Sequence, residues 1–437
     1  MTAPKLISGF SKLDSGQKIQ WLVETMNLDR STADFFKSFE LSDKELQAVI
    51  ADLSENHLSN FHLPFSVAPN FLVDGQLMTF PLVTEESSVV AALAKAAGFW
   101  AKRGGFHTEI IGTEKKGQLH FCWKGAPEKL VGLFPQIKKQ LLDEVAPLTK
   151  NMERRGGGMT AIELKYLPEV LPNYFQVDVS FETCDAMGAN FINSCLEQFG
   201  RSLKNWAQNN EAFQAEEKQV EIIMAILSNY VPNSRVKVLV ECSLEELETD
   251  PMQARQLAEK LVQAVQISQR DVSRAVTHNK GIFNGVDALA IATGNDFRAI
   301  ESGAHAYAAR NGSYSGLSEA GILDGKFWFS LEMPLAVGVL GGVTRLHPLA
   351  KVAMKILGHP SARQLMSYLA VAGLASNWSA VKALVTTGIQ QGHMKMHLSN
   401  ILCSFSLSDE QKQAARLYFQ DREVSFSEVQ KYLSEHA

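Results

Sequence analysis

The spacing of apolar residues between Gln118 and Val240 constrains the fold more than any other feature of this 437-residue chain. Alternating apolar residues predict strands, and helical spacing predicts helices. The strands are expected at 118–123, 161–166, 174–181 and 236–240, and the helices at 127–145, 187–203 and 220–227. This order approximates the split βαβ repeat of a ferredoxin-like domain, with one additional helix. Residues of about 112–240 are therefore expected to form a compact insert within a larger body.

Length and composition narrow the class of protein further. The chain is too long for one hydrophobic core, so two or three domains are expected. An apolar fraction of 46% excludes a disordered chain, and 42 basic against 47 acidic residues provide no overall field for nucleic acid. Neither a signal peptide nor an apolar run of membrane-spanning length is recognised. The five cysteines form no CxxC pair, which favours a reducing cytoplasm.

Helical patterns surround the insert. The first fifty residues read as polar amphipathic helices. Asp250 followed by Pro251 predicts a helix start, because Asp is a favoured cap and Pro fits the first helical position. Residues 362–386 predict a long apolar helix, and the tail from 406 to 437 is polar and amphipathic.

Two segments place charged groups beside apolar or glycine-rich sequence. Glu85 and Glu86 follow an apolar run and precede the apolar stretch 89–97, which is typical of a helix amino terminus. Lys280 lies within the polar segment Arg274–Gly285, which is read as a surface loop. A lysine next to a glycine there could alternatively approach a ligand oxygen closely.

Polar residues also mark two expected helix starts. Asn295 and Asp296 follow a glycine and are expected to cap a helix that runs to Arg310. The segment Asp185–Asn190 joins a strand to a helix, whose free N–H groups could hold a phosphate. This segment is not GxGxxG, so no Rossmann fold is predicted.

His393 and His397 stand one helical turn apart near the end of the chain. Met394 occupies the place of the glutamate in the zinc-binding HExxH pattern, and no third ligand is evident, so no metal site is predicted. Two histidines on one turn could instead serve as a gated proton donor.

Taken in order, these segments resemble one family, the class II (soluble, bacterial) form of 3-hydroxy-3-methylglutaryl-CoA reductase. The resemblance covers most of the chain, and the ordered set is far more specific than any one segment. It runs through Glu55-Asn56, Leu63-Pro64, Thr84 to Ser87, Asp185 to Asn190, Thr277 to Gly285, Ala292 to Asp296, Gly303 to Ala306 and Gly392 to Met394.

This resemblance implies an α+β fold with three parts. A large mixed helical and sheet domain binds the acyl-CoA, an inserted ferredoxin-like small domain binds NAD(P), and a C-terminal helical flap follows. The implied boundaries are 1–111 and 241–389 for the large domain, 112–240 for the small domain and 390–437 for the flap. A homodimer with active sites at its interface, or a higher oligomer, is expected in the cytoplasm, with no membrane or nucleic-acid partner.

The implied reaction interconverts 3-hydroxy-3-methylglutaryl-CoA and mevalonate plus CoA by two hydride transfers with NAD(P)H through mevaldehyde. Such chemistry requires an oxyanion to be stabilised twice and a thiolate to be protonated once. By resemblance, Lys280 is the catalytic lysine and Asp296 the aspartate coupled to it. Glu86 protonates the aldehyde oxygen, and His393 of the flap protonates the departing thiolate.

The resemblance also implies contacts with both ligands. Arg274 is a suitable partner for the free carboxylate of the substrate. The implied substrate contacts are Ser88, Arg274, Thr277, Asn284, Asn229, Asn377 and His397. The implied cofactor contacts are Asp185, Met187, Gly188 and Asn190.

Cofactor choice depends on the group that meets the ribose 2′ position, where a carboxylate selects NAD and basic residues accept the phosphate of NADP. In the NAD-selective form an acidic residue precedes Gly156-Gly157-Gly158 by about two helical turns, and Thr149 is closest to that place here. Lys150, Arg154 and Arg155 lie nearby, together with Asp143, Glu144 and Glu153. We therefore expect NADPH to be preferred over NADH.

Two departures from the family pattern and two alternative functions stay open at this point. The usual Glu-Asn-Val-Ile-Gly is Glu55-Asn56-His57-Leu58-Ser59 here, and the proline that usually follows the glutamate pair is Ser87. The alternatives are reduction of a different acyl-CoA on the same scaffold and a CoA- or nucleotide-binding relic without activity. Intact Glu86, Lys280, Asp296 and His393 argue against the relic, and the direction of the reaction in the cell is not predicted.

Overall fold

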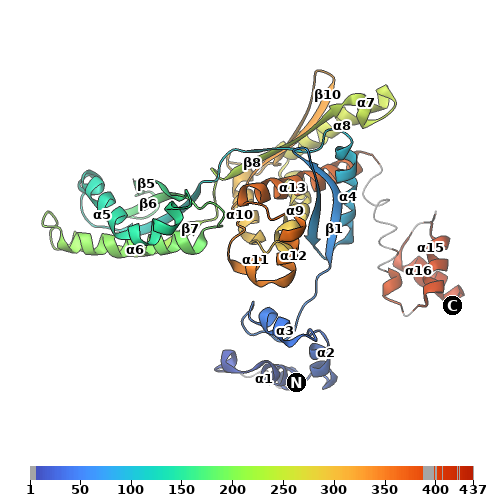
Figure 1. Cartoon of the computed structure of the whole chain (residues 1–437), viewed down its shortest axis with the longest axis horizontal. Helices are drawn as coiled ribbons and strands as arrows, with labels where there is room; N and C mark the ends of the chain where they lie inside the picture. Colours follow the sequence, from blue (N-terminus) through green and yellow to red (C-terminus); the bar gives the residue numbers. More distant parts are fainter. Residues whose placement is uncertain are drawn as a thin grey trace.

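A computed structural model describes residues 6–386, 398, 401–405, 407–420, 422 and 424–436. Two bodies with separate hydrophobic cores make up most of this part of the chain. The smaller body extends to one side of the larger one, and the N-terminal helices lie below the larger body in the view of Figure 1.

The smaller body is a four-stranded antiparallel sheet with two helices packed against it. The strand order is β5-β6-β4-β7, which with the chain order βαββαβ is the ferredoxin-like arrangement, as predicted. Phe175, Val177 and Val179 of the central strand point into the core that these helices cover. The elements are β4 Lys115–Cys122, α5 Pro127–Glu153, β5 Gly158–Tyr166, β6 Tyr174–Glu182, α6 Ala189–Asn209 and β7 Glu221–Ser228.

Two of the predicted elements are corrected by the sheet. The helix predicted at 220–227 is the edge strand β7, in which a bulge opposite His120 and Phe121 breaks the alternation. Because of the bulge, two successive core-facing residues of this strand, Ile222 and Ala225, are three positions apart in the sequence, a spacing that is typical of a helix. The strand predicted at 236–240 exists as β8 Arg235–Ser243, but it pairs with β3 and β10 of the larger body.

The larger body combines a second four-stranded sheet, a β-hairpin and a set of helices around α13. Its sheet has the order β3-β8-β10-β9, and the hairpin joins β1 to β2. Helix α13 is buried along most of its length and packs against α9, α4, α8 and both central strands, as Figure 1 shows. The strands are β1 Phe65–Val73, β2 Gln76–Val83, β3 His107–Ile110, β9 Ser318–Leu323 and β10 Lys326–Pro334. The helices are α4 Ser87–Ala101, α7 Leu244–Leu247, α8 Pro251–Arg270, α9 Val272–Ala292, α10 Phe297–Ala308, α11 Gly342–Leu346, α12 Pro348–Ile356 and α13 Ala362–Val385.

Side-chain caps fix where the long helices begin. The Asp250 carboxylate accepts the Gln253 N–H with Pro251 at the first turn of α8, as the sequence predicts. Asp271 caps α9 in the same way by accepting the Arg274 N–H. Ser361 and Gln364 form a reciprocal capping box at α13. Each cap satisfies N–H groups that the helix itself leaves unpaired.

Three short helices precede the hairpin, and the segment that departs from the family pattern packs onto them. Ser59 Oγ, in place of the usual glycine, donates to Phe36 O at 2.5 Å, and Asn60 Nδ2 donates to Phe39 O at 3.0 Å. Ser59 and its neighbour Asn60 thus tie the chain to its own N-terminal helices. These are α1 Ser15–Thr25, α2 Ser31–Ser38 and α3 Lys44–Ala51, preceded by the short 3₁₀ helix η1 Phe10–Lys12.

Near the end of the chain, α15 Asp409–Tyr418 and α16 Phe426–His436 share a small apolar cluster of their own with Leu398, Ile401 and Leu402. Over the described residues, no helix combines the length and the apolar character that crossing a membrane requires.

Candidate active site

Helix α9 carries four of the predicted site residues on one face. The segment Arg274–Gly285, which the sequence reading placed in a surface loop, lies inside this helix. At about 100° per residue, Arg274, Thr277, Lys280 and Asn284 fall within roughly a third of the helix circumference. This face of the helix therefore carries a guanidinium, a hydroxyl, an ammonium and an amide group.

Glycines in this segment misled the loop prediction because they serve helix packing. A Cβ at Gly285 would lie 2.2 Å from Ala372 O in α13, so only glycine permits this approach of the two helices. The polar residues beside the glycines face away from that contact or bond within the fold. Asn279, for example, is buried and accepts the Leu317 N–H at 3.0 Å.

Glu86 reaches Lys280 from a different element. It precedes α4 as its N-cap residue, in agreement with the predicted helix amino terminus. Its Oε2 lies 3.8 Å from Lys280 Nζ, and its Oε1 accepts a hydrogen bond from Ser88 Oγ. The side chains remain 42% exposed for Glu86 and 65% exposed for Lys280. A carboxylate and an ammonium thus meet where a ligand from solvent can reach both.

Asp296 takes a different set of partners from those expected. Its carboxylate caps α10 by accepting the N–H groups of Arg298 and Ala299, and the Arg298 guanidinium lies 3.3 Å from the same Oδ1. The predicted cap is therefore present. In the described part of the chain, the ion-pair partner of Lys280 is Glu86 and that of Asp296 is Arg298.

The remaining substrate candidates differ in how free their side chains are. Arg274 is partly buried, which lowers the pKa of its guanidinium, and no carboxylate among the described residues forms an ion pair with it. Thr277 Oγ1 bonds back to Ser273 O at 3.2 Å. Asn284 is partly exposed, and Asn229 is exposed. Arg274 is thus an available cation close to the Lys280 pair.

Asn377 is fully engaged inside the fold. It is 1% exposed, donates to His278 O at 3.2 Å and accepts from Ser318 Oγ at 2.9 Å. Ser318 also bonds His278, and burial, helped by nearby Arg274, lowers the pKa of His278 to about 3. A direct contact of Asn377 with substrate would require this buried side chain to become accessible.

The predicted cofactor segment forms a tight turn between β6 and α6, at the junction of the two bodies. Asp185 Oδ1 accepts the Ala362 N–H at 2.8 Å, and Asp185 O accepts the Val339 N–H at 2.9 Å. Gly188 has φ 99° and precedes α6 without a side-chain cap, so the first N–H groups of the helix lack a side-chain acceptor. A dinucleotide phosphate fits such a helix start.

Three residues at this turn escaped the sequence reading. Lys115 donates a hydrogen bond to Thr183, which lies in the turn. Gly338 packs against the turn so closely that a Cβ there would lie 2.3 Å from Met187 N. Lys115 lies just before the alternation that predicted its strand, and Gly338 lies in a glycine-rich run. No local pattern connects either residue to Asp185.

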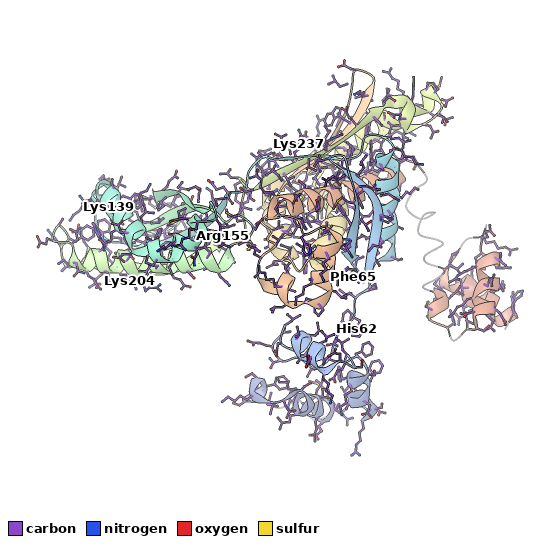
Figure 2. All side chains as sticks on the ribbon, in the orientation of Figure 1. His62, Phe65, Lys139, Arg155, Lys204 and Lys237 are labelled. Carbon is purple, nitrogen blue, oxygen red and sulfur yellow. The ribbon has the colours of Figure 1, made fainter. Side chains whose placement is uncertain are left out.

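The basic residues expected near the cofactor ribose are exposed at the end of α5. Lys150, Arg154 and Arg155 are exposed, and Arg155 lies on the side of the smaller body that approaches the larger one (Figure 2). Thr149 is instead 1% exposed, and its Oγ1 bonds Ala146 O. The helical phase turns Thr149 to the core with Val145 and Met152, so Thr149 itself cannot read the ribose.

His393 and His397 lie outside the described residues. Within the described ranges, no group of three or more His, Cys, Asp or Glu side chains is placed to hold a metal ion.

Comparison with known proteins identifies the scaffold. A family model described as "Hydroxymethylglutaryl-coenzyme A reductase" matches residues 17–398. The chain is 32% identical to a 3-hydroxy-3-methylglutaryl-coenzyme A reductase of Archaeoglobus fulgidus, over 96% of this chain and 92% of that protein. It is 30% identical to a probable reductase of Borreliella burgdorferi, over 88% of this chain and 85% of that one.

Solved structures agree with the sequence comparison. The reductase of Streptococcus pneumoniae superposes with a TM-score of 0.73 at 34% identity, covering 99% of this chain and all of that one. A structure of the class II enzyme from the same organism, bound to NADPH in open conformations, gives 0.71 at 36% identity over 87% of this chain and 100% of that one.

The family match and the similar proteins thus identify the chain as an NAD(P)H-dependent oxidoreductase. The chain belongs to the hydroxymethylglutaryl-coenzyme A reductase family, in its class II form.

Proposed function

We propose that this chain reduces 3-hydroxy-3-methylglutaryl-CoA to mevalonate and CoA in two steps, with NADPH preferred over NADH. Family membership supports the reaction, and one geometric observation carries the assignment of its site. Lys280 of α9 lies 3.8 Å from Glu86 at the start of α4, with Arg274 on the same face of α9. This supports Lys280 as oxyanion stabiliser beside the proton donor Glu86, with Arg274 on the same helix face as the partner for the substrate carboxylate.

The residues of this chain divide the work between binding and proton transfer. NADPH, when bound, supplies the hydride in both steps. Lys280 stabilises the negative charge that develops on the carbonyl oxygen, first of the thioester and then of the aldehyde. Glu86 lies 3.8 Å from Lys280 and, in its protonated form, gives the proton that this oxygen takes up; Ser88 orients the Glu86 carboxyl through its hydrogen bond. His393, on the flap, protonates the CoA thiolate that leaves between the two steps.

Asp296 supports this site indirectly in the proposal. Its hydrogen bonds fix the start of α10, and Asn295 beside it accepts the Gly338 N–H at 3.0 Å. The segment therefore connects the catalytic helices with the glycine-rich loop that meets the cofactor turn. The coupling of Asp296 with Lys280 that the family resemblance implies stays a prediction, since the ion-pair partner of Asp296 in the described residues is Arg298.

Substrate binding is assigned to groups that remain available. Arg274 pairs with the free carboxylate of the hydroxymethylglutaryl group, since a half-buried guanidinium without a carboxylate partner favours such an anion. Thr277, Asn284 and Asn229 add polar contacts, and His397 contributes from the flap. Asn377 acts mainly by holding α9, through the His278 carbonyl.

The cofactor is assigned to the smaller body. Asp185, Met187, Gly188 and Asn190 line the dinucleotide, whose pyrophosphate meets the start of α6. Lys150, Arg154 and Arg155 favour the 2′-phosphate of NADPH, because exposed basic groups accept it. We assign the smaller body, from β4 through β7, to the cofactor, the flanking segments with β8 to the acyl-CoA and residues 390–437 to the flap.

The assembly and the compartment complete the proposal. A homodimer places its two active sites at the subunit interface. The cysteines Cys122, Cys184, Cys195, Cys242 and Cys403 are all free, which fits a reducing cytoplasm.

The test is an assay of substrate-dependent loss of NAD(P)H absorbance. We expect turnover with hydroxymethylglutaryl-CoA, a higher kcat/KM with NADPH than with NADH, and no comparable turnover with acetyl-CoA. Higher efficiency with NADH would contradict the cofactor assignment. A folded chain that turns over with neither cofactor would end the enzyme assignment.

A further inference from the structure

A lysine is buried beneath the cofactor turn. Lys115, the first residue of β4, is 5% exposed, and its Nζ donates to Thr183 Oγ1 at 2.6 Å and to Ala186 O at 3.3 Å. Burying an ammonium is unfavourable unless hydrogen bonds compensate it. Burial lowers the pKa of Lys115 to about 8, although Glu182 and Cys184 oppose the shift. An apolar side chain of similar length would avoid this penalty, so the charge points to a role beyond filling space.

The bonds of Lys115 converge on one carbonyl group. Thr183 Oγ1 also donates to Ala186 O, at 2.7 Å, and the Ala186 N–H donates to Thr183 O at 3.0 Å. The Ala186 carbonyl therefore receives an ammonium and a hydroxyl together. This arrangement closes the turn from Thr183 to Ala186 and prevents it from opening toward solvent.

The same residues set the path of the chain into α6. A Cβ at Gly188 would lie 2.5 Å from Thr183 Cγ2, so the methyl group of Thr183 packs directly against the residue that starts the helix. Gly188 adopts φ 99°, a left-handed conformation that favours glycine. A movement of Thr183 would therefore displace the first N–H groups of α6.

The turn is also fixed against the larger body, through Asp185 and Gly338. Lys115 supplies the support on the side of the smaller body. Both sides of the cofactor segment are thus held by contacts within the protein.

We propose that Lys115 is a positioning residue for cofactor binding, which holds the Thr183–Ala186 turn and the start of α6 in the conformation that receives the nicotinamide dinucleotide. The inference rests on the proposed function, which assigns Asp185 to Asn190 to that ligand. Lys115 itself touches neither the dinucleotide nor the reacting atoms.

The test measures NADPH binding by fluorescence titration of the full chain with Lys115→Met. We expect the Kd to rise about tenfold, because a charge-assisted hydrogen bond to the turn is lost. The thermal midpoint is expected to stay equal or to rise, since an apolar side chain removes a buried charge. A purely structural lysine would give the opposite result, with a lower midpoint and an unchanged Kd.

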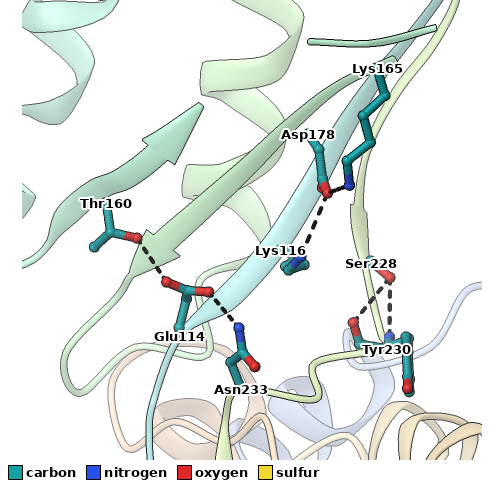
Figure 3. Close-up of polar contacts among 8 residues, drawn as sticks. All are labelled: Glu114, Lys116, Thr160, Lys165, Asp178, Ser228, Tyr230 and Asn233. Carbon is teal, nitrogen blue, oxygen red and sulfur yellow. Dashed lines mark hydrogen bonds and ion pairs between the residues drawn. The ribbon is translucent and has the colours of Figure 1, made fainter. Parts of the chain in front are cut away.

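The neighbouring residue provides the matched control. Lys116 follows on the same strand, points to the other face of the sheet and lies 3.5 Å from Asp178 (Figure 3). Lys165 also pairs with Asp178, so Lys116→Met leaves that carboxylate with a partner. Lys116→Met is expected to bind NADPH with the Kd of the original chain.

Substitutions at Thr183 test the inference independently of Lys115. Thr183→Val keeps the shape of the side chain but removes the hydroxyl that links Lys115 with Ala186 O. Its Kd is expected to rise as in Lys115→Met. Thr183→Ser keeps the hydroxyl and is expected to restore most of the affinity. This pair remains informative if Lys115→Met does not fold.

The pH dependence of binding gives a further readout. Above pH 8 the neutral amine of Lys115 is a weaker donor, so the Kd of the original chain is expected to rise, whereas that of Lys115→Met stays flat. Glu182 and Cys184 also face Lys115, and Arg155 and Asp185 lie near Cys184. Burial, together with Glu182, raises the pKa of the Cys184 thiol above its ordinary value. The pH profile is assigned to Lys115, so Cys184→Ser is expected to keep it.

The two levels of the proposal fail differently. A Lys115→Met chain with an unchanged Kd and an unchanged pH profile would overturn the inference and leave the proposed function intact. A folded original chain that binds neither NADPH nor NADH would overturn both.

Discussion

The two halves of the proposed site are built in opposite ways. In the larger body, the Glu86–Lys280 pair is separated by 3.8 Å, and its side chains are 42% and 65% exposed. In the smaller body, the cofactor turn rests on Lys115 and Thr183, which are 5% and 0% exposed. The catalytic pair in the larger body is exposed to solvent, whereas buried hydrogen bonds fix the cofactor turn in the smaller body.

This difference indicates whether each half of the site is already in its final conformation before a ligand binds. An exposed ion pair contributes little to stability, so Lys280 can leave Glu86 for a substrate oxygen at low cost. Buried hydrogen bonds keep the cofactor turn in one conformation before the ligand arrives, which reduces the entropy lost on binding. The catalytic half is therefore expected to depend on substrate and flap for its final geometry, whereas the cofactor half is expected to be ready in the free chain.

The largest effect is expected from Lys280→Ala. Removal of the group that stabilises the oxyanion is expected to lower kcat about a thousandfold in the reduction of both hydroxymethylglutaryl-CoA and free mevaldehyde. NADPH binding is expected to be unchanged, since Lys280 belongs to the catalytic half alone. Steady-state assays of both half-reactions measure the effect, with the exposed Lys351→Ala as control. Loss in only one half-reaction would show that Lys280 does not serve both oxyanions.

Glu86→Gln is expected to lower kcat about a hundredfold, because a positioned acid is lost while the shape of the side chain is kept. Glu85→Gln, one residue earlier and exposed, provides the control and is expected to be close to unaltered. Equal losses in the two variants would mean that the Lys280 contact does not distinguish the two carboxylates.

His393→Gln separates the steps of the reaction. Reduction of the thioester is expected to fall about a hundredfold, whereas reduction of free mevaldehyde is spared, because no thiolate leaves in that half-reaction. Parallel assays with the two substrates measure the ratio. An equal fall in both would assign a different role to His393.

The paired change Arg154→Gln and Arg155→Gln tests the cofactor half. Affinity for NADPH is expected to fall about tenfold and affinity for NADH to stay constant, because only NADPH carries the 2′-phosphate. Lys139→Gln, on the same helix but away from Arg155 in Figure 2, is the control. An equal fall for both cofactors would place the arginines elsewhere along the dinucleotide.

The smallest effect is expected at Asp287 of α9, which lies close to Glu301 of α10. Burial raises the pKa of Asp287 well above its usual range, and Glu301 adds to the shift. The folded state therefore favours the protonated acid, and its stability is expected to fall as pH rises above the unfolded pKa of about 4. Asp287→Asn mimics the neutral acid and is expected to be more stable than the original chain by about 1 kcal/mol at pH 9.

Urea unfolding at pH 5, 7 and 9 measures this difference in the free energy of unfolding. Asp324→Asn, in an exposed turn, is the control and is expected to keep the original pH dependence. A difference between Asp287→Asn and the original chain that shrinks toward high pH would contradict the buried acid.

Local pattern predicted much of the fold, whereas the candidate catalytic residues came from the family resemblance. Alternation located β4, β5 and β6, and cap chemistry located the starts of α8 and α10. Each of these signals depends on residues that are close in sequence. The order of family segments then brought Glu86 and Lys280 together, although 194 residues separate them (280 − 86).

What escaped the sequence depends on contacts between distant segments. The bulge in β7 and the pairing of β8 with the other sheet are set by partner strands. Gly285 of α9 is required by the close approach of α13, so a glycine that serves helix packing suggested a loop where a helix lies. Lys115 acts through Thr183, 68 residues away, and only its deeper burial distinguishes it from partly exposed Lys116.

The most direct test of the proposed function is the stoichiometry of a complete turnover. NADPH oxidation is followed by absorbance, and CoA release is followed by a thiol reagent in the same sample with hydroxymethylglutaryl-CoA. Two hydride transfers for each thioester predict about two NADPH oxidised for each CoA thiol released. A ratio of one, or oxidation without thiol release, would contradict the two-step reduction.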